Sequence, residues 1–186
     1  MRLIMNSSIE SVYNKHKNLK LAAIELGMKW QTLYVQLRNL GIPVTGDKSR
    51  YGSDKDRLAA FAELEFKKLV PFAEDQNRIK FQSKFDFLVG KEKVDIKASN
   101  EKQGCKNFAA KRWSFSVKKQ EFCADFIVCF AITENAYKVF LLPGELIRTY
   151  QTISISTSPD SKSKWLQYEV TPMELSQFFF DIMAIK

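Results

Sequence analysis

Two aspartates, Asp86 and Asp95, are spaced so that they can face each other across a β-hairpin. The segments Phe85–Val89 and Glu92–Ser99 have the composition of strands, and Gly90-Lys91 between them suits a two-residue turn with glycine first. That turn fixes the register, so that the two aspartates are directly opposed on one face of the hairpin. The hairpin therefore predicts two carboxylates whose Cβ atoms lie roughly 4.5–5.5 Å apart.

Lys97 follows Asp95 by two residues and therefore shares this face. Opposed carboxylates repel each other, and a bound divalent cation such as Mg²⁺, which requires hard oxygen ligands, removes the repulsion. A lysine beside them can position or deprotonate a water, or stabilise charge that develops on a phosphate. These residues predict metal-assisted hydrolysis of a phosphodiester. The alternative is an exposed pair of Asp95 and Lys97, with Asp86 solvated.

A long amphipathic helix precedes the hairpin and can supply a third carboxylate. It begins at Ser53 or Asp54 and ends at Pro71. Its inward stripe consists of Leu58, Ala62, Phe66 and Leu69. Glu63 and Glu65 lie beside the stripe, and one of them near the hairpin face would complete a metal site.

At these residues the chain resembles the PD-(D/E)XK nuclease superfamily, whose pattern is an acid on a first helix, an Asp on a strand and Asp/Glu-x-Lys on the next strand. The matching residues are Glu63, Asp86 and the run Asp95-Ile96-Lys97, with Phe85 where the pattern has proline. The Ala-Glu spacing favours Glu63 over Glu65. The resemblance implies that Glu63, Asp86 and Asp95 bind Mg²⁺, with Mn²⁺ as the alternative ion, and that these three acids and Lys97 are catalytic.

The resemblance covers about residues 52–145 and implies an α/β (α+β) core like that of restriction endonucleases, with a mixed central sheet flanked by helices. Strands are expected at Arg78–Gln82, Trp113–Ser116, Phe126–Ile132 and Tyr137–Leu142, with weaker candidates in Leu146–Ser158 and Leu166–Val170. Thr171-Pro172-Met173-Glu174 is a capping box that opens a final apolar helix. Packing of this helix on the sheet is favoured over a subunit contact.

The first fifty residues form a separate pattern. Apolar residues at helical spacing in residues 18–43 predict two short helices joined by a turn at Gly27, and residues 8–15 supply a third helix. The segment resembles a helix-turn-helix DNA-binding domain through Ala22, Ala23, Leu26, Gly27, Thr32, Leu33 and Tyr34. The alternative is a three-helix adaptor that binds protein. The resemblance implies that the second helix enters the major groove, with DNA contacts from Lys29, Gln31, Thr32, Tyr34 and Arg38.

Excess positive charge lies in two places. The 186 residues carry a net charge of +8. Residues 1–50 hold eight basic and three acidic residues, and residues 97–119 hold seven basic residues and only Glu101. Such clusters suggest a polyanionic partner. Candidate phosphate contacts in the second cluster are Lys102, Lys106, Lys111 and Arg112, unless this segment is only a flexible basic loop.

Composition excludes several other classes of protein. No apolar run approaches the roughly 18 residues of a membrane span, and the N-terminus does not read as a secretory signal. Three cysteines without metal-ligand spacing read as reduced thiols, so we expect a cytoplasmic protein. The single histidine argues against a Ser-His-Asp triad.

The sequence predicts a helix-turn-helix domain over residues 1–45, a linker over residues 46–53 and a nuclease-like domain over residues 54–186. The function expected first is a sequence-specific, Mg²⁺-dependent endonuclease of the restriction or homing type that acts on double-stranded DNA as a homodimer. The alternatives are a structure-directed nuclease, such as a Holliday-junction resolvase, and a non-enzymatic DNA-binding regulator.

Overall fold

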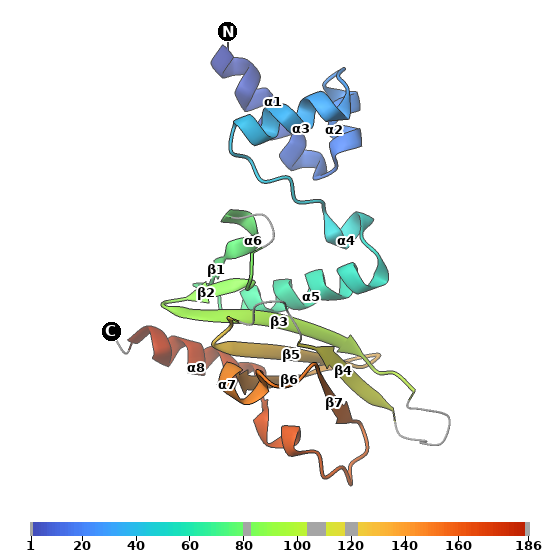
Figure 1. The fold of residues 1–186 in the computed structure, drawn as a ribbon, viewed down its shortest axis with the longest axis vertical. Helices are drawn as coiled ribbons and strands as arrows, with labels where there is room; N and C mark the ends of the chain where they lie inside the picture. Colours follow the sequence, from blue (N-terminus) through green and yellow to red (C-terminus); the bar gives the residue numbers. More distant parts are fainter. Residues whose placement is uncertain (1, 80–82, 104–110, 118–122, 185–186) are drawn as a thin grey trace. The chain divides into compact units, whose positions relative to one another are not determined.

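The computed structural model describes residues 2–79, 83–103, 111–117 and 123–184 (Figure 1). Its contacts divide the chain into two compact units. The N-terminal unit comprises Met1–Arg57 and Asn77–Ser83, and the C-terminal unit comprises Leu58–Gln76 and Lys84–Lys186. The division falls within helix α5 (Asp54–Leu69) rather than in the predicted linker.

Three helices build the core of the N-terminal unit, as the apolar spacing predicts: α1 (Arg2–His16), α2 (Leu19–Glu25) and α3 (Trp30–Asn39). Asn18 caps α2 by accepting hydrogen bonds from the next backbone N–H groups, and Gly27 turns the chain at a φ of +64°. The buried residues are Ile9, Tyr13, Ala22, Ala23, Leu33 and Leu37. Trp30, the first residue of α3, is 44% exposed.

The predicted linker, residues 46–53, is held against α1. The Tyr13 hydroxyl donates to the Thr45 carbonyl at 2.9 Å, and the Asp47 N–H donates to the Lys17 carbonyl at 2.9 Å. Asp47 then caps a short helix, α4 (Lys48–Tyr51). The predicted linker therefore contains a short capped helix, because polar side chains that lack an apolar period can still form caps and turns.

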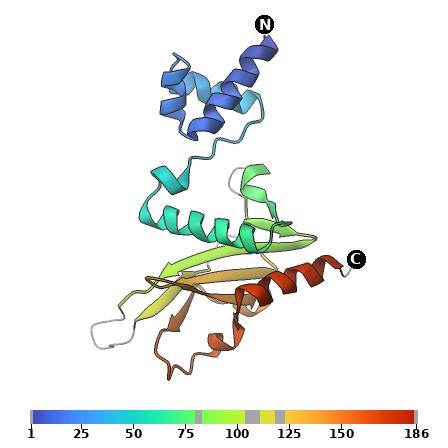
Figure 2. The same ribbon diagram turned by 180° about the vertical axis from the view of Figure 1, so that it is seen from behind.

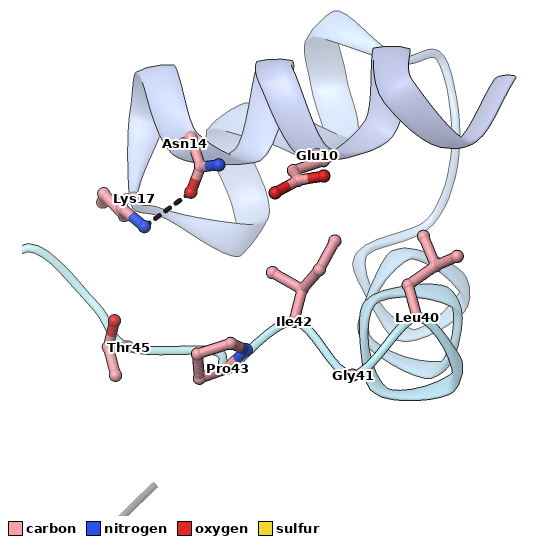
Figure 3. Close-up of a pocket in the computed structure, with 8 residues that line it drawn as sticks. All are labelled: Glu10, Asn14, Lys17, Leu40, Gly41, Ile42, Pro43 and Thr45. Atoms are coloured by element: carbon pink, nitrogen blue, oxygen red, sulfur yellow. Dashed lines mark hydrogen bonds between the residues drawn. The ribbon is translucent and has the colours of Figure 1, made fainter. Parts of the chain in front are cut away.

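A pocket of about 640 Å³ lies between α1 and the chain that follows α3 (Figure 3). Its apolar floor comes from Leu40, Ile42 and Pro43. On its rim, Lys17 donates a hydrogen bond to Asn14 at 2.6 Å.

The C-terminal unit is built on a six-stranded mixed sheet in the order β1-β2-β3-β5-β6-β8, in which only the β3–β5 pair is parallel. A second sheet pairs β4 with β7. The strands are β1 (Glu74–Asp75), β2 (Phe87–Val89), β3 (Glu92–Asn100), β4 (Arg112–Ser116), β5 (Phe126–Ile132), β6 (Tyr137–Pro143), β7 (Thr152–Ser156) and β8 (Glu169–Val170). The remaining elements are α6 (Gln76–Ile79), α7 (Gly144–Ile147), the 3-10 helix η1 (Lys164–Tyr168) and α8 (Pro172–Ala184).

The two faces of the large sheet bury different cores. On one face, α5 and α8 pack through Ala62, Phe66, Leu175 and Phe179 against alternate strand residues such as Val94 and Ile96. On the other face, the β4–β7 sheet, α7 and η1 cover Ile127, Cys129, Phe140 and Leu142. This mixed α and β architecture confirms the expected fold class at that level, and the final helix packs on the sheet as predicted.

Some predicted strands are absent or shifted. The strand expected at Arg78–Gln82 is wrong for its first two residues, which lie in α6, and residues 80–82 lie outside the described residues. The edge of β2 is paired instead with β1, where Asp75 lies opposite Phe87. The segment expected to continue as a strand from Leu146 begins in α7, and the segment from Leu166 lies mostly in η1.

Candidate active site

The hairpin of β2 and β3 has the predicted register. Phe87 lies opposite Val94, and Val89 lies opposite Glu92. Gly90 adopts a φ of +63°, the left-handed conformation that glycine tolerates without strain. The paired strand β2 begins at Phe87, so Asp86 lies directly before it.

Asp86 is fixed to β3 by its backbone and its side chain. Its N–H donates to the Val94 carbonyl at 3.0 Å, and its Oδ2 accepts a hydrogen bond from the Ile96 N–H at 2.7 Å. The Asp86 carboxylate therefore continues the hydrogen bonding between β2 and β3 beyond Phe87, the first residue of β2. This bond holds Asp86 beside the stretch of β3 that carries the other two candidates.

Asp95 is 2% exposed and forms an ion pair with Lys97, whose Nζ lies 2.5 Å from Asp95 Oδ2. The Lys97 side chain is 18% exposed, so the pair contacts solvent mainly through the lysine. The alternative of an exposed strand pair is therefore wrong, because the central position of β3 buries the carboxylate. The structure pairs Asp95 with Lys97 and holds the Asp86 carboxylate on Ile96, the residue between them.

The neighbouring strand β5 completes the surroundings of this pair. In the parallel register, Asp95 lies beside Ile127, and Lys97 lies beside Cys129. Burial strongly raises the pKa of the Cys129 thiol, an effect that the Lys97 charge opposes. Ser99 continues the same face of β3, where its hydroxyl accepts from the Ser114 N–H at 2.9 Å. The contacts of Cys129 and Ser99 with the site were missed in the sequence, since they depend on strands distant along the chain.

The two candidate helix acids, Glu63 and Glu65, both lie on α5. The buried stripe of α5 packs on the Val94 and Ile96 face of the sheet, whereas Asp95 and Lys97 alternate to the other face. Glu65 is engaged elsewhere, with Lys68 at 2.6 Å and the Tyr137 hydroxyl at 3.4 Å. The partly buried Glu63 is the neighbouring acid on the same helix.

No three His, Cys, Asp or Glu side chains are grouped closely enough to hold a metal ion within the part of the chain that the structure describes. The full predicted set of Glu63, Asp86 and Asp95 is therefore not gathered here. Two aspartates nevertheless fit Mg²⁺, which proteins usually hold through one or two carboxylates together with waters and substrate phosphates.

The predicted DNA-contacting face of α3 has the expected exposure. Leu33 and Leu37 are buried in the core of the N-terminal unit. The candidates Lys29, Gln31, Thr32, Tyr34 and Arg38 are all exposed. This side of the helix is thus available to a partner, and the nature of that partner remains a prediction.

The basic segment is seen only in part. Lys102, Lys111 and Arg112 are exposed, and Lys106 lies outside the described residues. Lys111 Nζ lies 3.3 Å from Glu101, a solvent-exposed pair of small energetic value. Among the described helices, none is long and apolar enough to cross a membrane.

Comparisons with known proteins give a structural likeness but no match in sequence. No family model and no curated protein matches the sequence. The chain is similar to the solved structure of a bacterial homing endonuclease, I-Ssp6803I, over 72% of this chain and 99% of that one. The two are 14% identical in sequence, with a TM-score of 0.49. Because a likeness of this size is too small to assign a function, the geometry of the site has to support one.

Proposed function

We propose that this chain is a metal-dependent DNA endonuclease that cuts at specific sequences, of the restriction or homing type. The observation that carries the proposal is the buried Asp95, paired with Lys97 at 2.5 Å and flanked by the anchored Asp86. A buried ion pair contributes little net stability compared with apolar residues of similar size. A buried carboxylate with a charged partner beside a second carboxylate is instead a frequent arrangement in catalytic sites.

Asp86 and Asp95 would hold the divalent cation, Mg²⁺ or Mn²⁺. Glu63 is the proposed third ligand on the superfamily pattern alone, because the buried stripe of α5 packs on the face of the sheet opposite to Asp95 and Lys97. When bound, the cation would polarise the phosphoryl group and help to activate water. The Ile96 N–H keeps the Asp86 carboxylate in place, so little ordering is needed when a ligand arrives. The Lys97 ammonium would stabilise charge that develops on the phosphate, or would orient the attacking water.

DNA binding is assigned to two surfaces. In the proposed helix-turn-helix role of the N-terminal unit, Gln31 and Arg38 on α3 reach base edges in the major groove, with Lys29, Thr32 and Tyr34 beside them. In the C-terminal unit, Lys102, Lys111 and Arg112 contact phosphates. A cut through both strands requires two active sites or two successive nicks, so we propose a symmetric dimer on a two-fold site.

A second candidate function is a non-enzymatic DNA-binding regulator. It is favoured by the finding that no three metal-binding side chains are grouped among the described residues. In that case the pair of Asp95 and Lys97 would serve only to specify the packing of the sheet.

The test is incubation of the purified full-length protein with plasmid DNA and Mg²⁺ or Mn²⁺, with and without a chelator. The proposal expects discrete fragments that disappear with the chelator. Cleavage of branched junctions without discrete fragments from plasmid would indicate a structure-directed nuclease instead. Retention of DNA binding without any cleavage would support the regulator and contradict the proposal.

A further inference from the structure

The β4–β7 sheet has one apolar and one hydroxyl-bearing face. The apolar face carries Trp113, Phe115, Ile153 and Ile155, which are buried against the large sheet. The other face carries Arg112, Ser114, Ser116, Thr152, Ser154 and Ser156. The register pairs these six residues directly across the two strands, Arg112 with Ser156, Ser114 with Ser154 and Ser116 with Thr152.

This hydroxyl face is open to solvent. Arg112, Ser114, Ser116 and Thr152 are exposed, and the two remaining serines are partly exposed. None of the six residues is acidic or apolar. Aromatic and β-branched residues are the ones that stabilise strands across a pair, so a ladder made mainly of serines is a poor choice for stability alone.

The strand β4, which carries half of this face, contacts the strand and the loop that follow the candidate active site. The Ser114 N–H donates to Ser99 Oγ at 2.9 Å, and the Arg112 N–H donates to the Lys102 carbonyl at 2.8 Å. Both views show β4 beside the far end of β3 (Figures 1 and 2). Ser99 follows Lys97 by two residues of the same strand, which is about 7 Å. The strand that carries half of the hydroxyl face is therefore hydrogen-bonded to the strand that carries the ion pair.

We propose that the hydroxyl face of β4–β7 reads base edges in the major groove of duplex DNA, next to the bond that is cut. This inference rests on the proposed endonuclease function. A two-stranded ribbon fits the major groove, which is about 12 Å wide, and short side chains let it approach the bases closely. Serine and threonine hydroxyls can donate to or accept from base edges.

The charge around the face matches a nucleic acid. Lys102, Lys111 and Arg112 are exposed at one end of the ribbon, and the nearby acid, Glu101, is already paired with Lys111. The phosphate contacts proposed above would hold the ribbon on the duplex and fix its register, whereas the hydroxyls would supply sequence information.

The test compares full-length wild-type protein with Ser114→Ala/Ser154→Ala. The matched control is Ser8→Ala/Thr149→Ala, which removes two exposed hydroxyls outside the ribbon. Each protein is used to select sequences from a randomised duplex library in the presence of a chelator, and its cuts are mapped with Mg²⁺. We expect the ribbon variant to lose roughly 3- to 10-fold of its discrimination per lost contact, at base pairs beside the cut. The control should keep the wild-type preference.

The outcomes separate this inference from the proposed function. Unchanged base preference in the ribbon variant, with normal cleavage, overturns the inference and leaves the endonuclease intact. An equal loss of affinity on all sequences also overturns it, because phosphate contacts alone would act in that way. If the protein selects sequences but cuts none, the endonuclease proposal fails, and the selection in chelator still decides whether the ribbon reads DNA. Absence of DNA binding overturns both.

Discussion

The carboxylates of Asp86 and Asp95 each have a partner, so they repel each other less than two carboxylates without partners would. Lys97 neutralises Asp95, and the Ile96 N–H satisfies one oxygen of Asp86. A bound cation is therefore not needed to offset the repulsion between the two carboxylates, although their oxygens suit a cation. The sequence places the three residues on one face, and the structure adds that their charges are already partly compensated.

Replacing Lys97 with methionine should destabilise the C-terminal unit by about 3–5 kcal/mol, because Asp95 would keep a buried charge without its ammonium partner. The double variant Asp95→Asn/Lys97→Met should regain part of that loss, since no buried charge remains. Chemical denaturation measures both, with the exposed Lys91→Met as the control. Equal stabilities of the wild type and Lys97→Met would show that the ion pair does not carry this energy.

The choice between the two helix acids, Glu63 and Glu65, can be tested by cleavage kinetics. Glu65 is engaged with Lys68 and Tyr137, so Glu65→Gln should mainly affect packing and stability. Glu63→Gln should reduce the cleavage rate more strongly than Glu65→Gln at equal DNA affinity. Single-turnover cleavage by the two variants provides the comparison. The reverse order would make Glu65 the helix acid.

At the scale of elements, turns and helix caps could be predicted from the sequence, whereas the pairing of strands far apart in the chain could not. The two-residue turn at Gly90 fixed the hairpin register, and the capping box at Thr171 located α8, because both depend on a few adjacent residues. The pairing of β1 with β2 and the packing of β4–β7 over Ile127 and Cys129 could not be predicted. Their residues are far apart in the chain, and no local pattern specifies which strand edge they meet.

The cap of α8 predicts a dependence of stability on pH. The Thr171 N–H donates to the Glu174 carboxylate at 2.7 Å, and this bond holds the Glu174 pKa below its ordinary value of 4.5. A pKa that is lowered on folding contributes stability above the unfolded pKa, and the contribution is lost as pH falls through the folded pKa. Glu174→Gln should therefore flatten the loss of stability below about pH 4.5.

Denaturation of the full chain between about pH 5 and pH 3 provides the measurement. The exposed Glu134→Gln serves as the control, because no hydrogen-bonded cap involves Glu134 among the described contacts. Identical slopes for Glu174→Gln and the wild type would contradict the capping account.

At the scale of the whole molecule, base reading by α3 is assigned to the N-terminal unit, whereas cutting and the proposed reading by β4–β7 are assigned to the C-terminal unit. Gln31→Ala and Arg38→Ala should each relax discrimination at particular base pairs by about 1–3 kcal/mol, if they make bidentate contacts. The cleavage rate on a saturating optimal duplex should remain near that of the wild type. Selected sequences and single-turnover rates of the intact variants test both expectations. Unchanged sequence preference would mean that α3 does not read DNA.

The most direct test of the central claim is to measure cleavage and binding of one duplex by Asp95→Asn. Cleavage is followed with Mg²⁺ present and binding with a chelator, beside the exposed-acid control Asp160→Asn. The proposed site predicts that Asp95→Asn loses at least about 100-fold in cleavage rate and binds the duplex within a few-fold of the wild type. Asp160→Asn should match the wild type in both measurements. Cleavage by Asp95→Asn at a rate near that of the wild type would contradict the assignment of the active site.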